Sequence, residues 1–294
     1  MGTTWNPDPW AAPVVDHTVT MPASNGYCHV ASRSGAGQTH VLGMLMRHPD
    51  IRAHFGLNLA TNLAAWLRST SVEIGNGVWN EGRTWKAHEL RAMVDGFRAT
   101  EAPATAWVDV SCMYYAAPRL LEVVFPGATV AITLRHHLDR ARVHLAKFDL
   151  LNDANTEDER YGVWLHYAVY YGLVGDSVLL RELPDAVLIN YDQQATEDGY
   201  VALWRGVYTA LGVDPDAVDL VAAYATQSAT LSIGAWQTDD FTNACLSRLE
   251  ASDPELAALL RSGAHTAGGR ILAEYRDVPK PEAVVRCLQR RGIG

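Results

Sequence analysis

The stretch ASRSGAGQTHVLGMLMRHPDI, residues 31–51, decides the fold. It starts with small residues at the end of an apolar run, passes through a loop that contains Gly35 and Gly37, and continues as a periodic apolar segment up to Pro49. Apolar residues three and four positions apart predict an amphipathic helix, which the proline ends. The order strand, glycine-containing loop, helix predicts the first βα turn of an α/β fold, where such folds bind ligands.

The loop of residues 32–39 keeps the spacing of the phosphate-binding pattern G-x-x-x-x-G-K-[ST] but lacks its cation. Gly37 and Thr39 match the second glycine and the hydroxyl, whereas Ser32 and Gln38 replace the first glycine and the lysine. The backbone N–H groups of the loop and the positive end of the following helix still form an anion site. A plain turn rich in small residues is the alternative. The position after the first strand favours phosphate or sulfate binding.

Short apolar segments alternate with helical patterns along the rest of the chain. The predicted strands are residues 26–32, 105–111, 129–134 and 186–191. The predicted helices begin at residue 38, cover most of 57–102, and continue at 116–125, 136–148, 156–183 and 199–212. The order strand, helix, strand over residues 105–134 predicts a βαβ unit with parallel pairing. The chain is therefore expected to be α/β, with a central parallel sheet, helices on both faces and a helical C-terminal part.

Composition favours one domain that acts on small molecules. The 294 residues are 48% hydrophobic, enough for one large core over residues 25–294, and the proline-rich residues 1–24 predict an extended arm. The net charge of -9 opposes nucleic-acid binding. Without a basic start or a long apolar run, the chain is expected to be cytoplasmic and not membrane-bound; a homodimer is left open. The scattered cysteines predict reduced, buried thiols rather than a zinc site. These are Cys28, Cys112, Cys245 and Cys287.

Three blocks of the sequence resemble the sulfotransferase family that uses 3'-phosphoadenosine-5'-phosphosulfate. Residues 32–51 resemble that family's 5'-phosphosulfate loop and helix, which often ends in His-Pro-Asp. Residues 108–145 are similar to the segment that runs from an acidic strand through an FPGA turn to an arginine-tipped strand and the 3'-phosphate helix. Residues 186–215 resemble the later strand with a Tyr-Glu-Asp-Leu signature. The resemblance implies a P-loop-like fold, this donor with adenosine 3',5'-bisphosphate as product, and no metal.

The resemblance also implies which residues bind the 5' end of the nucleotide. Gly37 and Thr39 match the family loop, whereas the family's cation, serine and first threonine are replaced. Arg33 lies two residues before the cationic position and is a candidate substitute, since a guanidinium suits phosphate and sulfuryl oxygens. The whole implied loop is Arg33, Ser34, Gly35, Ala36, Gly37, Gln38 and Thr39.

The resemblance also implies which residues bind the 3'-phosphate and the rest of the nucleotide. Arg135 matches the family arginine for the 3'-phosphate. The family serine eight residues later is Val143 here, and its neighbours Arg142 and His144 are the candidate replacements. Tyr191 matches the family tyrosine near the nucleotide.

The implied chemistry is an in-line displacement in which the protein positions the reactants and donates hydrogen bonds, with Arg33 among the catalytic candidates. Asp109, at the end of a predicted strand, is the first candidate for the base that deprotonates the acceptor; a helix-capping carboxylate is an equal alternative. His40 is the second candidate, although a packed histidine is the commoner role. The side chains of the adjacent residues His136 and His137 are expected to diverge, which favours a helix start or a solvated pair over a metal site.

Three functions remain open from the sequence. The first is transfer of a sulfuryl group to a hydroxyl or amine of a small molecule, with bacterial secondary metabolism as the expected setting. The second is a protein of the same fold repurposed for a donor-independent reaction or for ligand binding. The third, a degenerate P-loop NTPase or kinase, is disfavoured by Gln38 and by an arginine, Arg135, where a magnesium-binding acid is expected.

Overall fold

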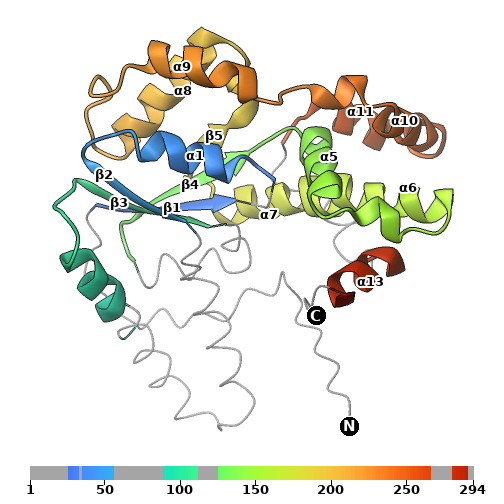
Figure 1. The fold of residues 1–294 in the computed structure, drawn as a ribbon, viewed down its shortest axis with the longest axis horizontal. Coiled ribbons are helices and arrows are strands. Elements are labelled where there is room, and N and C mark those ends of the chain that lie inside the picture. Colours follow the sequence, from blue (N-terminus) through green and yellow to red (C-terminus); the bar gives the residue numbers. More distant parts are fainter. Residues whose placement is uncertain are drawn as a thin grey trace, which may run out of the picture.

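A computed structural model describes residues 26–32, 35–55, 89, 91–111, 125–265 and 280–290 (Figure 1). The expected N-terminal arm, the predicted helix at 116–125 and most of the predicted helical region 57–102 lie outside the described residues. Arg33 and Ser34 also lie outside them.

Five parallel strands form one sheet in the order β2-β3-β1-β4-β5. The strands are β1 (Tyr27–Ser32), β2 (Ile51–Phe55), β3 (Ala106–Ser111), β4 (Thr129–Leu134) and β5 (Val187–Asn190). At the centre, β1 pairs with β3 on one side, with His29 opposite Asp109, and with β4 on the other. The all-parallel sheet confirms the α/β prediction, and four of its strands coincide with the predicted ones within one residue or two.

Two details of the sheet differ from the prediction. Strands β3 and β4 are parallel, but they do not pair, because β1 lies between them. The edge strand β2 is absent from the predicted strands. Only Ile51 in β2 is fully buried, and Arg52 and His54 interrupt its apolar character, so an edge strand of this kind lacks the apolar signal of a central one.

One face of the sheet is covered by three helices (Figure 1). They are α1 (Gln38–Leu45), α8 (Glu197–Ala210) and α9 (Leu220–Gln227). Met44 of α1 and Trp204 of α8 share a buried core with strand residues such as Val30. The Tyr208 hydroxyl donates a hydrogen bond to the Met44 carbonyl oxygen at 2.8 Å, which joins α8 to the end of α1.

The opposite face is covered by α7 (Gly175–Glu182) and by the helical residues 91–99. Leu179 and Leu183 pack against apolar side chains of β1 and β4. The Tyr27 hydroxyl of β1 donates to the Asp95 carboxylate at 2.6 Å. Helices therefore flank both faces, as predicted.

The predicted helix at 156–183 is one continuous run with an unusual centre. It consists of α6 (Glu157–Leu165), the π-helical stretch His166–Val174 and α7. This run packs against α5 (His137–Lys147) and, with the C-terminal helices, forms a second core. The C-terminal helices are α10 (Asp240–Ser252), α11 (Pro254–Ser262) and α13 (Glu282–Arg290).

The described residues include three of the four cysteines and many helices. Cys28, Cys245 and Cys287 are free and buried, as predicted, while Cys112 lies outside the described part. No helix in the described ranges is both long enough and apolar enough to cross a bilayer.

Candidate functional site

The candidate site lies where β1, β4 and β5 end. The glycine loop follows β1, Arg135 follows β4 and Tyr191 follows β5 directly. Because parallel strands end at one edge of the sheet, these three segments meet there. The chain leaves β1 toward the β2 side of the sheet and leaves β4 toward β5, although β1 and β4 are neighbours. This is a topological switch point, the usual ligand crevice of an open α/β sheet.

The glycine loop has the backbone of an anion cradle. Gly35 and Gly37 have φ values of 84° and 90°, a left-handed region that favours glycine. Gly37 precedes α1, whose first turn has no side-chain cap and no acidic residue. Its terminal N–H groups therefore keep their partial positive charge for a ligand. Gln38 is buried in this turn, whereas Thr39 is exposed.

Tyr191 fixes the loop and the arginine relative to each other. A Cβ atom at Gly37 would lie 2.5 Å from the Tyr191 ring, so the ring occupies the space that any other residue at this position would need. The guanidinium carbon of Arg135 lies 4.8 Å from the centre of the same ring, a cation–π contact. The structure thus brings together three of the elements that the sequence predicted to bind the nucleotide.

Arg135 is buried, with 4% of its surface exposed, and its hydrogen bonds go to neutral oxygens. Its Nη1 donates to the Gly35 carbonyl oxygen at 3.1 Å, and its Nη2 donates to the Ser232 carbonyl and hydroxyl oxygens at 2.8 and 2.9 Å. Within the described ranges, Nε has no acceptor and no carboxylate lies within 4.0 Å of the guanidinium. Burial lowers the pKa of Arg135, yet an arginine stays protonated, so the crevice holds a full positive charge.

His144 reaches the loop from α5. Its Nδ1 lies 4.0 Å from the position that a Cβ of Gly35 would take. The ring stacks on Tyr167, with 4.5 Å between ring centres. Of the positions predicted near the 3'-phosphate, His144 is buried beside Gly35, and Val143 is only partly buried.

Asp109 lies within β3 rather than at its tip. The strand continues for two residues, to Ser111, and the Asp109 side chain is fully buried. Its register partners are His29 on β1 and His54 on β2. Burial lowers the pKa of His29 to about 3, so that ring is neutral, while burial and then the charge of Asp109 raise the pKa of Cys28 to about 12.

His40 belongs to a packed polar network on the α1 face of the sheet. Its Nε2 lies 2.6 Å from Gln194 Oε1, which also accepts from Trp204 Nε1 at 3.1 Å. With the Gln227 amide turned, its nitrogen donates to His40 Nδ1 at 2.9 Å. Burial lowers the pKa of His40. Both ring nitrogens then have protein partners.

The segment that closes the crevice was not predicted. Asp139, in the first turn of α5, accepts backbone N–H groups from Gly234 at 2.6 Å and Trp236 at 3.0 Å. Together with the Arg135 contacts to Ser232, these bonds attach residues 232–236 to Arg135 and to the start of α5. A single serine and a single carboxylate, far apart in sequence, carry no spacing that could reveal this contact.

His136 is the N-cap residue of α5, so the histidine pair lies at a helix start, as predicted. Its ring Nδ1 accepts from the Leu138 N–H at 3.3 Å, and the ring stacks on Trp236 at 5.0 Å. His137 instead turns inward and is fully buried.

Comparison with known proteins gives distant likenesses in structure only. No protein-family model matches the chain, and no curated protein is similar to it. A sulfotransferase from Alicyclobacillus acidocaldarius is similar at 19% identity and a TM-score of 0.45, over 82% of this chain and 100% of that one. The sulfotransferase domain of the Synechococcus PCC 7002 olefin synthase is similar at 12% identity and a TM-score of 0.45, over 93% of this chain and 97% of that one.

Proposed function

We propose that the protein is a sulfotransferase that moves a sulfuryl group from 3'-phosphoadenosine-5'-phosphosulfate to a hydroxyl or amine of a small molecule. The observation that supports it best is the convergence of the loop at Gly35–Gly37, Arg135 and Tyr191 at the switch point of the sheet. A left-handed glycine loop, an uncapped helix start and an arginine with no carboxylate partner suit a ligand with phosphate groups.

The described residues fit the nucleotide in two places. The loop amides and the start of α1 would hold its 5' end, and Arg135 with His144 would hold the 3'-phosphate, where the Nε of Arg135 is a donor without an acceptor. When bound, the nucleotide supplies a sulfuryl group on a good leaving group. The chain positions it and neutralises its charge; no step needs a resident metal.

Asp109 is the base of this proposal. The Asp109 carboxylate lies on β3, beside the strand that carries the loop. The second candidate, His40, packs in a polar network on the α1 face, with protein partners on both ring nitrogens. The role of Asp109 is to accept the proton of the acceptor hydroxyl or amine as the sulfuryl group is transferred. Asp109→Asn should lower kcat at least 100-fold while the affinity for adenosine 3',5'-bisphosphate changes less than threefold. A parallel loss of nucleotide affinity would instead give Asp109 a structural role.

A titration without magnesium tests the donor. Calorimetry with adenosine 3',5'-bisphosphate should show one site per chain, and the melting temperature should rise, because ligand binding stabilises the folded state by RT ln(1 + [L]/Kd). Transfer of label from the sulfated nucleotide to phenols, alcohols and amines then tests the reaction. No binding at millimolar nucleotide would contradict the proposal. Binding of ATP that requires magnesium would point to an NTPase or kinase instead.

A second function is favoured by the contacts of Arg135. Because both of its Nη groups donate to protein oxygens, the crevice can be held closed by the chain itself. A protein of this fold that binds an anionic ligand without transferring a sulfuryl group would show the same geometry. Binding of the bisphosphate without transfer to any acceptor of the panel would favour this second function.

A further inference from the structure

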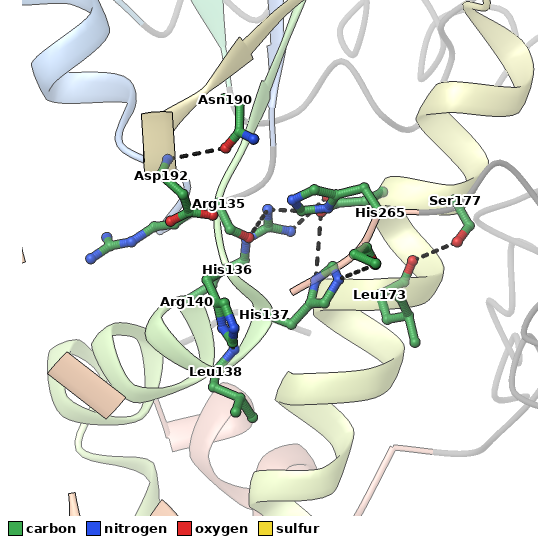
Figure 2. A network of polar contacts seen from close by, with 12 residues as sticks. Arg135, His136, His137, Leu138, Arg140, Leu173, Ser177, Asn190, Asp192 and His265 are labelled. Atoms are coloured by element: carbon green, nitrogen blue, oxygen red, sulfur yellow. Dashed lines mark hydrogen bonds and ion pairs between the residues drawn. The ribbon is translucent and has the colours of Figure 1, made fainter. Parts of the chain in front are cut away.

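A second polar cluster lies under the candidate site and has no part in the proposed reaction. His137 begins α5, Asp176 is in α7, and His265 follows α11. Figure 2 shows the rings of His137 and His265 turned toward each other, with 4.6 Å between the ring centres. Three segments that are distant in sequence therefore place two imidazoles and one carboxylate together.

The geometry points to a binding site for one divalent transition-metal ion, with zinc as the expected ion: we propose that His137, Asp176 and His265 are its ligands. One ligand atom from each residue lies within 4.8 Å of the other two. Asp176 Oδ2 is 3.0 Å from His265 Nδ1 and 3.7 Å from His137 Nδ1. Zinc–nitrogen bonds of about 2.0–2.1 Å at tetrahedral angles separate ligand atoms by roughly 3.3 Å, which lies between these two distances.

The hydrogen of the neutral His137 ring lies on Nε2, which leaves Nδ1 with a lone pair that faces the carboxylate. His137 Nε2 faces the Ala264 carbonyl oxygen at 3.2 Å, and because a carbonyl only accepts, Nε2 carries the hydrogen. In the neutral ring His137 Nδ1 is then the acceptor, and it faces Asp176 Oδ2, another acceptor, at 3.7 Å, which is too far for a hydrogen bond. Among the described residues this nitrogen has no hydrogen-bond partner.

His265 approaches the same carboxylate from the other side. Its Nδ1 lies 3.0 Å from Asp176 Oδ2, but the pair lacks the alignment of a hydrogen bond. Two imidazole nitrogens therefore converge on one carboxylate oxygen, as the ligands of a metal site do. The backbone carbonyl on His137 Nε2 is also the usual outer contact of a metal-binding histidine.

Arg140 orients the carboxylate for this role. Its Nη1 and Nη2 donate to Asp176 Oδ1 and Oδ2 at 2.7 and 3.0 Å, which leaves Oδ2 a second lone pair for the ion. These two charge-assisted hydrogen bonds fix the position of the carboxylate.

The charges of the cluster select the kind of metal. A histidine that binds a metal does so as a neutral imidazole, so with one carboxylate and one guanidinium the ligand-competent set sums to zero, and attraction to a divalent ion must come from nitrogen coordination. Imidazole suits zinc, copper and nickel, whereas magnesium and calcium prefer sets of oxygens. Three protein ligands also leave a coordination position for water or an anion.

The ion would brace the candidate site from below. Arg140 Nη2 also donates to the Arg135 carbonyl oxygen at 3.3 Å, and Arg140 Cγ lies 3.3 Å from the position of a Cβ at Gly35. A metal on Asp176 would thus tie α5, α7 and the end of α11 to the arginine and the loop. Its role is structural support, separate from the sulfuryl chemistry.

Metal titration of the full chain, prepared without a histidine tag and stripped with a chelator, tests the proposal. Cobalt should bind at one ion per chain with the visible absorption of a tetrahedral site, and zinc should displace it and raise the melting temperature. His265→Gln and His137→Gln should each weaken binding at least tenfold. His54→Gln is the matched control, because His54 also pairs with a carboxylate, Glu101 at 3.0 Å, but lies on β2.

Two results would overturn the site. One is a wild-type chain that binds neither cobalt nor zinc at one ion per chain. The other is binding that survives His265→Gln unchanged, which would place the ion on other histidines. His265 has a side chain that is 10% exposed, so this variant decides the matter even where His137→Gln does not fold. Bisphosphate titration of the metal-free protein keeps this test separate from that of the proposed function.

Discussion

Two buried arginines, five residues apart, differ in the charge of the groups that they contact. Arg140 donates both Nη groups to the Asp176 carboxylate, and neither side chain is exposed to solvent. Arg135 donates its Nη groups to neutral oxygens of Gly35 and Ser232 and packs on an aromatic ring. The first guanidinium contacts a carboxylate; among the described residues the second does not, although the charges of Asp139 and Asp192 act on it and offset part of the lowering of its pKa by burial. A buried guanidinium that contacts no carboxylate costs free energy. An anionic ligand that pairs with Arg135 would remove that cost, so the unpaired charge, rather than burial as such, indicates a binding site.

The same comparison separates support from binding. Arg140 lies on a helix beneath the loop and holds two helices together, whereas Arg135 lies at the strand end that faces the crevice. Changes at the first arginine should therefore act on folding, and changes at the second on the ligand.

The largest expected effect is the loss of the buried ion pair. Asp176→Ala should lower the free energy of unfolding by about 3–5 kcal/mol, because Arg140 is left charged and unpaired in the core. Asp158→Ala is the control: it removes the partner of Arg248, an exposed pair at 2.8 Å, and should cost no more than about 1 kcal/mol. Urea denaturation of both variants measures the difference. Similar losses would mean that the buried pair has no special weight.

Arg135→Ala should act on binding. It removes charged hydrogen bonds to the ligand, which are worth about 1.5–3 kcal/mol, so the Kd for adenosine 3',5'-bisphosphate should rise roughly 10- to 150-fold. Its effect on unfolding should be smaller than that of Asp176→Ala, since only neutral oxygens lose a donor. Arg205→Ala, at an exposed arginine paired with Asp216, should leave the Kd unchanged in calorimetry. An unchanged Kd in the Arg135→Ala variant would show that Arg135 does not bind the nucleotide.

Gly37→Ala tests the loop that Arg135 contacts. The left-handed conformation costs a residue with a side chain about 1–2 kcal/mol, and the added Cβ would collide with the Tyr191 ring. Stability and bisphosphate affinity should both fall. Gly43→Ala is the matched control on α1, because nothing lies within 4 Å of its Cβ position, and it should stabilise by about 0.5–1 kcal/mol. Equal melting temperatures for the two variants would contradict the described loop.

Stability in mild acid distinguishes the contribution of the buried ion pair from that of the buried histidines. Burial lowers the pKa of His29 to about 3 in the folded protein, whereas in the unfolded chain a histidine takes up a proton near pH 6.5. The free energy of unfolding is therefore highest above about pH 6.5 and declines as the pH falls below it. Between pH 7.5 and 6.0 this lowers the free energy of unfolding by roughly 1 kcal/mol. The low pKa of Asp176 keeps the Arg140 pair intact in that range. His29→Gln should flatten the decline in chelator-treated protein; an unchanged slope would rule out His29 as its source.

The sequence predicted those features that local pattern determines. The glycine loop, the arginine after an apolar strand and the tyrosine after another are local, and because parallel strands end at one edge, their convergence followed from the fold. Contacts between distant positions were not predictable. Ser232 on Arg135 and His265 beside His137 join residues about one hundred positions apart, and no periodicity links them. The strand order was not predicted either, because no local sequence pattern indicates that β1 lies between β3 and β4.

The π-helical stretch His166–Val174 has a consequence for Asp176, which follows it within one turn. A helix with i→i+5 hydrogen bonds winds more loosely than an α-helix, so the azimuth of every later side chain depends on how many residues are wound this way. In an α-helix each residue turns the chain by about 100°. Deleting one residue here would therefore rotate the downstream carboxylate out of phase with Arg140 and both histidines, although no residue that touches them is changed.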